Sequence, residues 1–135
     1  MTTQALIQEL ADLVDTGKLL TDADSLASHG SDWTKHFAPA PIAIAFPRSI
    51  EQVQAIVRWA NERKVALVPS GGRTGLSAAA VAANGEVVVS FDYMNRITEF
   101  NEFDRTLVCE AGVVTEQLQQ FAQEQDLYYP VDFAS

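Results

Sequence analysis

The chain has 135 residues, of which 47% are hydrophobic and 20% charged, a composition typical of one globular domain rather than a disordered or fibrous segment. Nine basic residues against 18 acidic ones give a net charge of −9, and no window gathers Lys and Arg on one face, so nucleic acid is not an expected partner. No apolar run approaches the roughly eighteen residues that cross a bilayer. Met1 to Val14 has Glu9 and Asp12 but no Lys or Arg, unlike a targeting sequence, so we expect a cytoplasmic protein without a transmembrane segment.

The first forty residues predict a helix and a linker. From Thr3 onward apolar residues recur at helical spacing, and Gly17 is placed to end the helix in the left-handed conformation. From Leu20 to Pro41 no period holds, so we expect a linker with one helical turn. Its ionisable side chains are interpreted as ordinary surface histidines and solvated loop acids: His29, His36, Asp22 and Asp24.

Residues 42 to 68 predict a strand, a helix and a second strand. The strands are the apolar runs Ile42 to Phe46 and Val65 to Val68. Between them, Ser49 and Gln52 have the spacing of a capping box, and the expected buried stripe of the helix is Val53, Ile56, Val57 and Ala60, with Trp59 also packed. This order is typical of a βαβ crossover, so we expect the two strands to be parallel neighbours.

The second half predicts a third strand, a hairpin and a helix. Glu86 to Phe91 is the strand, and Ile97 to Asn101 with Thr106 to Glu110 forms the antiparallel hairpin. A last helix is expected near residues 115 to 125. The single cysteine, Cys109, lies in an apolar run, which favours a buried, inert thiol in a reducing compartment.

The segment between the second and third strands, Ser70 to Ser77, is the best candidate for ligand binding. Its three glycines can adopt positive φ without steric cost, so that consecutive N–H groups can converge on an anion such as a pyrophosphate. Arg73 either adds a cation near the pyrophosphate or points into solvent, and solvent is favoured. The hydroxyl donors of the segment are Ser70, Thr74 and Ser77.

Two known phosphate loops do not match this segment. A P-loop requires a Lys after its second glycine, and this segment has none. A dinucleotide fingerprint requires Gly-x-Gly-x-x-Gly opening a helix, whereas Gly71-Gly72-x-x-Gly75 precedes no long helix. Glycine clusters also mark plain tight turns, so the residues alone do not decide between a phosphate-binding site and a simple turn.

A wider stretch of sequence resembles a known family. Pro69 to Ser77, with Val65 to Val68 before it and Val87 to Ile97 after it, resembles the first FAD pyrophosphate loop of the vanillyl-alcohol-oxidase-type (PCMH-type) flavoproteins. Three other stretches resemble further segments of the same domain: Pro47 to Val53, Val108 to Val113 and Leu127 to Asp132. Met94 to Ile97 and Tyr129 to Asp132 are most similar to the D-lactate, glycolate and D-2-hydroxyglutarate dehydrogenase branch.

The resemblance implies an α/β fold in which a small parallel βαβ sheet, flanked by helices, precedes the start of an antiparallel α+β lobe, with the cofactor in the crevice between them. It divides the chain into an N-terminal helix and linker, residues 1–40, and the N-terminal part of an FAD-binding domain, residues 41–135. The cofactor-binding residues that it implies are Pro69, Ser70, Gly71, Gly72, Arg73, Thr74, Gly75, Leu76, Ser77 and Ala78.

The activity that the resemblance implies is the oxidation of a 2-hydroxy acid, whose hydride passes to the flavin of FAD. Family members continue into a substrate domain, so no catalytic residue or metal ligand is expected in this chain, which alone should be inactive and hold FAD weakly or not at all. Two alternatives stay open. One is a stand-alone module that binds a phosphate or nucleotide without redox chemistry, and the other is a cofactor-free interaction domain that pairs as a homodimer.

Overall fold

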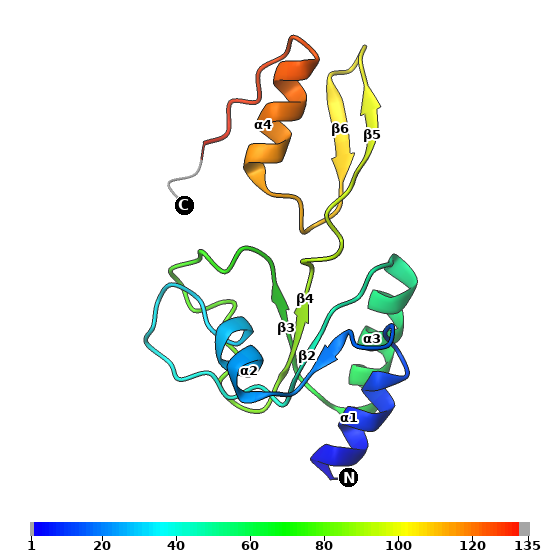
Figure 1. Cartoon of the computed structure of the whole chain (residues 1–135), viewed down its shortest axis with the longest axis vertical. Coiled ribbons are helices and arrows are strands. Elements are labelled where there is room, and N and C mark those ends of the chain that lie inside the picture. The colour runs from blue at the N-terminus through cyan, green and yellow to red at the C-terminus, as the bar shows by residue number, and fades with distance from the viewer. Residues whose placement is uncertain (1, 133–135) are drawn as a thin grey trace. The chain divides into compact units, whose positions relative to one another are not determined.

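The computed structural model describes residues 2–132, which fall into two compact units, Met1–Tyr93 and Met94–Ser135. Residues 133–135 of the expected FAD-binding domain lie outside the described part. The elements of the first unit (Figure 1) are α1 (Thr3–Ala11), β1 (Leu19–Leu20), α2 (Ala23–His29), β2 (Ala43–Ala45), α3 (Ile50–Arg63), β3 (Leu67–Ser70) and β4 (Val87–Ser90). Those of the second unit are β5 (Ile97–Asn101), β6 (Thr106–Cys109) and α4 (Thr115–Glu124). The predicted division at residue 40 stays a prediction.

The sheet of the first unit has the strand order β1-β2-β4-β3. β2 and β3 both run parallel to β4, and β1 pairs antiparallel with β2. The prediction that β2 and β3 are neighbours is therefore wrong, because β4 lies between them. The buried run Val87–Ser90 suits a central strand, whereas Pro69 in β3 lacks the N–H needed for pairing on both sides and suits an edge.

Alternating side chains of the strands build a core on each face of the sheet. Ala43, Val87 and Val89 pack on one face against Leu10 of α1 and residues of α3. The intervening residues Ile44, Phe46, Val68 and Val88 form the core of the other face, against which Leu26 of α2 packs. Since successive side chains of a strand point to opposite sides, one apolar run supplies both cores.

Helix α3 begins at the predicted cap. Ser49 Oγ accepts a hydrogen bond from the Gln52 N–H at 3.3 Å, while Gln52 Oε1 accepts one from the N–H of Arg48, one residue before the cap. The buried residues of the helix are Ile56, Trp59 and Ala60. Val57 was expected in the buried stripe, but its 43% exposure makes that prediction wrong. Trp59, and not Val57, lies on the buried side of the helix.

Two predictions for the first forty residues are wrong in detail. α1 ends at Ala11, before Gly17, although Gly17 does adopt the left-handed conformation with φ of 75°. The expected linker, Leu20 to Pro41, contains the last residue of the strand β1 and the whole seven-residue helix α2. Asp22, taken as a solvated loop acid, caps α2 by accepting a hydrogen bond from the Ser25 N–H at 2.9 Å.

The second unit contains the predicted hairpin and final helix. β5 and β6 pair antiparallel, with an irregularity between Ile97 and Glu99. The ring of Phe121 in α4 meets that of Phe100 in β5 edge-on at 5.3 Å. Cys109 is exposed, so the prediction of a buried thiol is wrong. Its strand has no buried residue, because only one small helix is available to cover this hairpin.

Candidate anion-binding site

The candidate loop leaves the sheet at the carboxyl end of β3. Ser70, the last residue of β3, pairs with Ser90, the last residue of β4, and both side chains are fully buried. The pairing continues one step further, because the Phe91 N–H donates to the Ser70 carbonyl at 3.0 Å. The loop thus begins from a rigid point at the edge of the sheet where ligands of parallel α/β folds are bound.

The glycines of the loop do not have the conformation that the sequence predicted. Gly71, Gly72 and Gly75 all lack positive φ, so that prediction is wrong. The left-handed residues are Arg73, with φ of 58°, and Ala78, with φ of 60°. Added Cβ atoms at Gly71 and Gly75 would meet no atom within 4 Å, and one at Gly72 would meet only a Thr74 methyl group at 3.9 Å. Neither backbone conformation nor internal crowding therefore requires glycine here.

The backbone N–H groups of the loop remain available to a ligand. Within residues 2–132, none of the amides from Gly71 to Ser77 donates a hydrogen bond to a backbone or side-chain acceptor of the chain. The residues from Thr74 to Ser77 are also exposed, which places their hydroxyl groups at the surface. Seven successive unpaired donors in one loop can bind an anion, since each amide needs an acceptor from water or a ligand.

Arg73 does not point into solvent, which corrects the favoured interpretation of the sequence. Its side chain is 26% exposed and folds back toward the sheet. Nη1 donates to the carbonyl of Gly71 at 3.1 Å, to Ser70 Oγ at 3.3 Å and to Asp92 Oδ1 at 3.4 Å. The guanidinium group therefore ties the loop to the ends of two strands.

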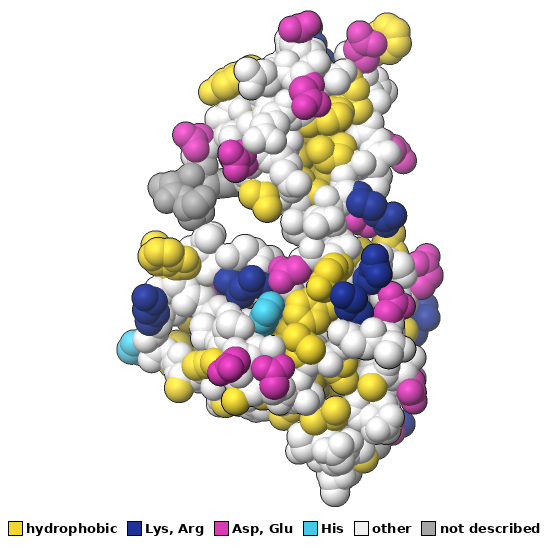
Figure 2. All heavy atoms as spheres, viewed as in Figure 1, with side chains coloured by type: hydrophobic (Ala, Val, Ile, Leu, Met, Phe, Trp, Pro, Cys, Tyr) yellow, Lys and Arg dark blue, Asp and Glu magenta, His cyan; other side chains and the backbone are white. Residues whose placement is uncertain are grey.

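Asp92 and His29 extend this cluster. The second carboxylate oxygen of Asp92 lies 3.4 Å from His29 Nε2. The other ring nitrogen of His29 contacts Ser28 Oγ at 3.0 Å, and the ring meets Phe46 edge-on at 5.2 Å. Only 19% of the His29 side chain is exposed, so its interpretation as an ordinary surface histidine is wrong. In the first unit, Figure 2 shows a histidine beside basic, acidic and hydrophobic side chains.

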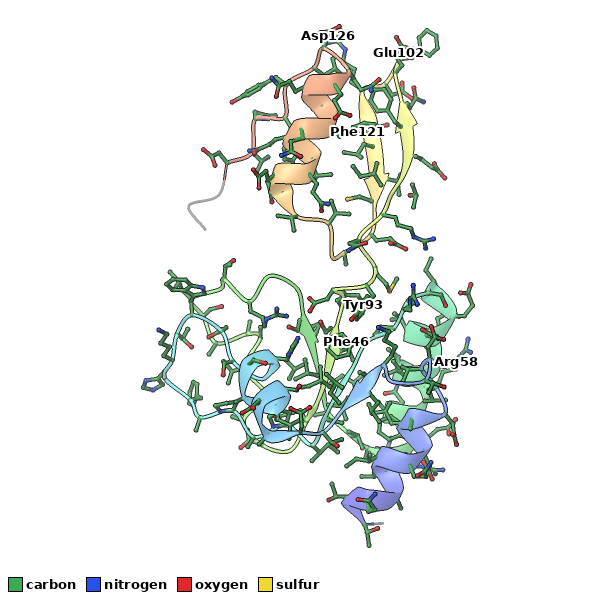
Figure 3. The ribbon with its side chains drawn as sticks, viewed as in Figure 1. Phe46, Arg58, Tyr93, Glu102, Phe121 and Asp126 are labelled. Atoms are coloured by element: carbon green, nitrogen blue, oxygen red, sulfur yellow. The ribbon has the colours of Figure 1, made fainter. Side chains whose placement is uncertain are left out.

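An aromatic pair lies at the same ends of the strands. The ring of Tyr93, three residues after β4, meets that of Phe46 at 5.6 Å, and both residues are labelled in Figure 3. Lys18 Nζ lies 3.7 Å from the centre of the Tyr93 ring, and the Arg48 guanidinium carbon lies 6.0 Å from it. These contacts place further positive charge near the carboxyl ends of the strands.

A buried carboxylate lies beneath the end of the loop. Asp32 is 7% exposed and accepts hydrogen bonds from Thr34, at 2.5 Å from Oγ1 and 2.9 Å from the N–H. These bonds, and to a lesser extent the amides of Ala80 and Ala78, lower the pKa of Asp32. Its Oδ2 has no hydrogen-bond partner within residues 2–132.

The second unit has a groove of its own. It is lined by Phe100, Phe121, Tyr128, Tyr129 and neighbouring side chains, and its volume is about 570 Å³. In the part of the chain that the structure describes, no three or more His, Cys, Asp or Glu side chains are arranged to hold a metal ion. Among residues 2–132, no helix is both long and apolar enough to cross a lipid bilayer.

The sequence analysis did not assign three residues to this site: Asp92, His29 and Asp32. Asp92 directly follows a predicted strand, so the rule that parallel strands end at one edge of a sheet could have placed it beside the loop. His29 could have been found only by predicting α2. For Asp32 the sequence gives no local signal of its 7% exposure.

The site is a candidate anion-binding loop at the carboxyl edge of a mixed α/β sheet, and comparison with known proteins gives the family of the chain. The model of the FAD binding domain family matches residues 41–135. The chain therefore belongs to the FAD-binding domain family. This assignment confirms the resemblance on which the cofactor prediction rests, and FAD is the cofactor of the family.

Two similar curated proteins from bacteria carry the same name. "D-2-hydroxyglutarate dehydrogenase" of Stutzerimonas stutzeri is 79% identical over all of this chain, which covers 29% of that protein. The protein of the same name from Xanthomonas citri pv. viticola is 51% identical over 98% of this chain and 28% of its own length. The chain thus spans less than a third of the length of these relatives.

A solved structure supports the fold. A p-cresol methylhydroxylase with bound substrate has a TM-score of 0.78 and 26% identity, over 92% of this chain and 25% of its own. The predicted α/β architecture, a small sheet with parallel strands followed by an antiparallel α+β lobe, is confirmed.

Proposed function

We propose that this chain is the N-terminal, FAD-binding part of a flavin-dependent dehydrogenase that oxidises a 2-hydroxy acid. The proposed substrate is D-2-hydroxyglutarate, in preference to D-lactate or glycolate. The names and high identities of the two bacterial relatives support this substrate class. FAD supplies the two-electron chemistry by accepting a hydride, and the residues of this chain bind and orient it. The proposed contact is between the cofactor's diphosphate and the loop Pro69 to Ala78.

The observation that carries the proposal is the unexplained glycine content of the loop. Gly71 and Gly75 lack positive φ, and a Cβ added at either position would meet nothing within 4 Å. A ligand that lies directly on the backbone gives a reason for both glycines, because it would occupy the space that a Cβ needs. The unpaired amides from Gly71 to Ser77 supply donors at the same place.

The chemistry of the donor set fits a diphosphate. Backbone amides and the hydroxyl groups of Thr74 and Ser77 bind phosphate oxygens without adding charge. The nearest full positive charge belongs to Arg73, which faces the carboxylate of Asp92. The loop is therefore close to neutral, so its binding of an anion depends on directed amides more than on net charge.

Location and assembly form the less specific part of the proposal. We propose a cytoplasmic protein on the bacterial origin of the two similar D-2-hydroxyglutarate dehydrogenases. A homodimer is proposed on the exposed apolar side chains of the second unit, such as Tyr128 at 85% exposure. Light scattering at several concentrations tests the dimer.

Flavin reduction tests the activity. The full-length polypeptide that contains this chain is purified, its flavin is released and identified, and the oxidised protein is mixed without oxygen with D-2-hydroxyglutarate, D-lactate or glycolate. We expect stoichiometric FAD and fastest bleaching of the flavin by D-2-hydroxyglutarate, with L-2-hydroxyglutarate as the control. A protein without FAD whose melting temperature responds only to ATP would contradict the proposal and favour a nucleotide-binding module.

Paired loop variants test the site. Gly75→Val fills space that is open in the protein, so it should leave the melting temperature of the apoprotein unchanged and weaken FAD binding at least about tenfold. Ala79→Val, at an exposed residue outside the proposed set, is the control and should bind FAD normally. Thr74→Glu should weaken binding more than Thr74→Gln, because only the first adds a charge that repels phosphate. Equal affinities throughout would remove this loop from the site.

A further inference from the structure

The loop has a side-chain clamp of its own, centred on Arg73. Arg73 is one of the non-glycine residues with left-handed backbone, a conformation that costs roughly 1–2 kcal/mol for an L-residue. Such a residue persists only where other contacts hold it. The contacts here are the three acceptors of Nη1, which come from the end of β3, the loop and the residue after Phe91.

The direction of the Arg73 side chain separates two roles. A residue that binds phosphate directly would extend its guanidinium fork toward the anion. Arg73 instead directs Nη1 to Ser70, Gly71 and Asp92, all of which belong to the protein. Its charge is offset by Asp92 before any ligand binds. The Nη1 end of the guanidinium group is therefore engaged by the loop and by the strand ends.

Asp92 is held in turn from a third element. Its Oδ2 faces Nε2 of His29, the last residue of α2, and the His29 ring is fixed by Ser28 and by the edge of Phe46. The Asp92 carboxylate lies 3.4 Å from Arg73 Nη1 and 3.4 Å from His29 Nε2. Charge-assisted bonds of full strength are ~2.8 Å long, so neither contact is strong alone and the clamp depends on their sum.

We propose that Arg73 is a positioning residue for the FAD diphosphate loop, clamped by Asp92 with support from His29, and not a ligand of the diphosphate. The proposal rests on the proposed function of the loop. By fixing the backbone between Gly71 and Thr74, the clamp orders the amide donors before the cofactor arrives. A loop ordered in advance loses less conformational entropy on binding, which strengthens affinity.

A double-mutant cycle tests the clamp. The apo form of the full-length polypeptide is titrated with FAD for the wild type, Arg73→Gln, Asp92→Ala and the double variant. The salt concentration is kept high, so that repulsion between Asp92 and the diphosphate is screened. We expect each single variant to weaken FAD binding by about threefold to thirtyfold, and the double variant to be no weaker than the worse single variant, because both remove one clamp.

Two further variants distinguish positioning from direct binding. Arg73→Lys keeps one nitrogen with several donors, and because all three contacts use a single nitrogen it should recover most of the affinity. His29→Phe keeps a ring against Phe46 but loses the contact to Asp92, and it should weaken FAD binding by only about twofold to threefold. Arg58→Gln is the control, because Arg58 donates its hydrogen bond to Gln54 of the same helix. This variant should leave the affinity for FAD unchanged.

The outcomes separate the clamp from the proposed function. Additive losses in the cycle, tighter FAD binding by Asp92→Ala at high salt, or unchanged affinity of Arg73→Gln would each overturn the clamp while leaving FAD as the cofactor. A wild-type apoprotein that binds no FAD would instead contradict the proposed function. Melting temperatures of the apo variants close to that of the wild type establish that the losses are not caused by unfolding.

Discussion

The two units differ in how completely they bury their own side chains. In the first unit, residues such as Leu10, Ile44, Ile56 and Val88 are fully buried, on both faces of the sheet. In the described part of the second unit, Met94 is the only buried residue, and neither its strands nor α4 contain one. The other apolar side chains in the described part of that unit, including Phe121, are half-buried at best.

This difference has consequences for stability and for the site. A two-stranded hairpin with one helix has little hydrophobic stabilisation without further packing. The candidate loop, in contrast, starts from Ser70 in the well-packed sheet, and Arg73 and Asp92 tie it to two strand ends. We infer that the first unit supplies a rigid base for the cofactor loop, while the second unit is the less stable one.

The largest expected effect comes from removing a core side chain of the first unit. Ile56→Ala should lower the free energy of unfolding by about 2–5 kcal/mol, because the fully buried side chain leaves a cavity. Val57→Ala, one position further on the same helix and 43% exposed, should cost less than about 1 kcal/mol. Urea unfolding followed by tryptophan fluorescence measures both, since Trp59 lies in the same core. Equal losses would contradict the assigned buried side of α3.

Local patterns predicted most of the elements but not their arrangement. The apolar runs that became β2 and β4 and the capped helix after Ser49 were predicted correctly, since period and capping are local properties. The position of β4 between β2 and β3 was not, because a strand's neighbours depend on the whole sheet. α2 was missed because it is seven residues long and none of them is buried.

The candidate loop was predicted in place but not in conformation. Glycine permits positive φ without requiring it, so three glycines could not reveal that Arg73 and Ala78 would adopt it instead. Arg73 was expected in solvent because its partner Asp92 is nineteen positions away in the sequence. Only the parallel pairing of β3 with β4 brings the two residues together.

A smaller effect is expected in the second unit. Phe121→Ala should lower the free energy of unfolding by about 1 kcal/mol or less, because its edge-on contact with Phe100 is its main aromatic partner and the ring is only half-buried. Hydrogen exchange of the hairpin amides should accelerate, while that of β2 and β4 should not change. A loss as large as that of Ile56→Ala, with exchange accelerated in both units, would show that they share one cooperative core.

The smallest expected effects come from two ion pairs and depend on pH. Glu9 accepts hydrogen bonds from Arg63 at 2.7 Å and from Trp59 at 2.9 Å, and the bond from Arg63 is the main reason that the pKa of Glu9 is lowered. In the second unit, the pKa of Glu110 is lowered mainly by its hydrogen bond with Arg96. A carboxyl group whose pKa is lower in the folded state stabilises the fold above its unfolded pKa, ~4.3 for Glu, and loses this contribution as the pH falls through the folded value.

Glu9→Gln and Glu110→Gln should therefore lower the melting temperature slightly at pH 7, and the difference from wild type should shrink as the pH falls below about 4. Both carboxylate oxygens of Glu9 and of Glu110 accept hydrogen bonds. Glutamine keeps one of these acceptors, replaces the other with an NH2 donor and removes the charge, so the pH dependence of the difference identifies the ionic part of each interaction. Because Glu9 joins α1 to α3, its variant should shift the transition of the first unit, and the Glu110 variant that of the hairpin. A difference that stays constant from pH 7 to pH 3 would mean that packing, and not the charge of Glu9 or Glu110, is what each variant changes.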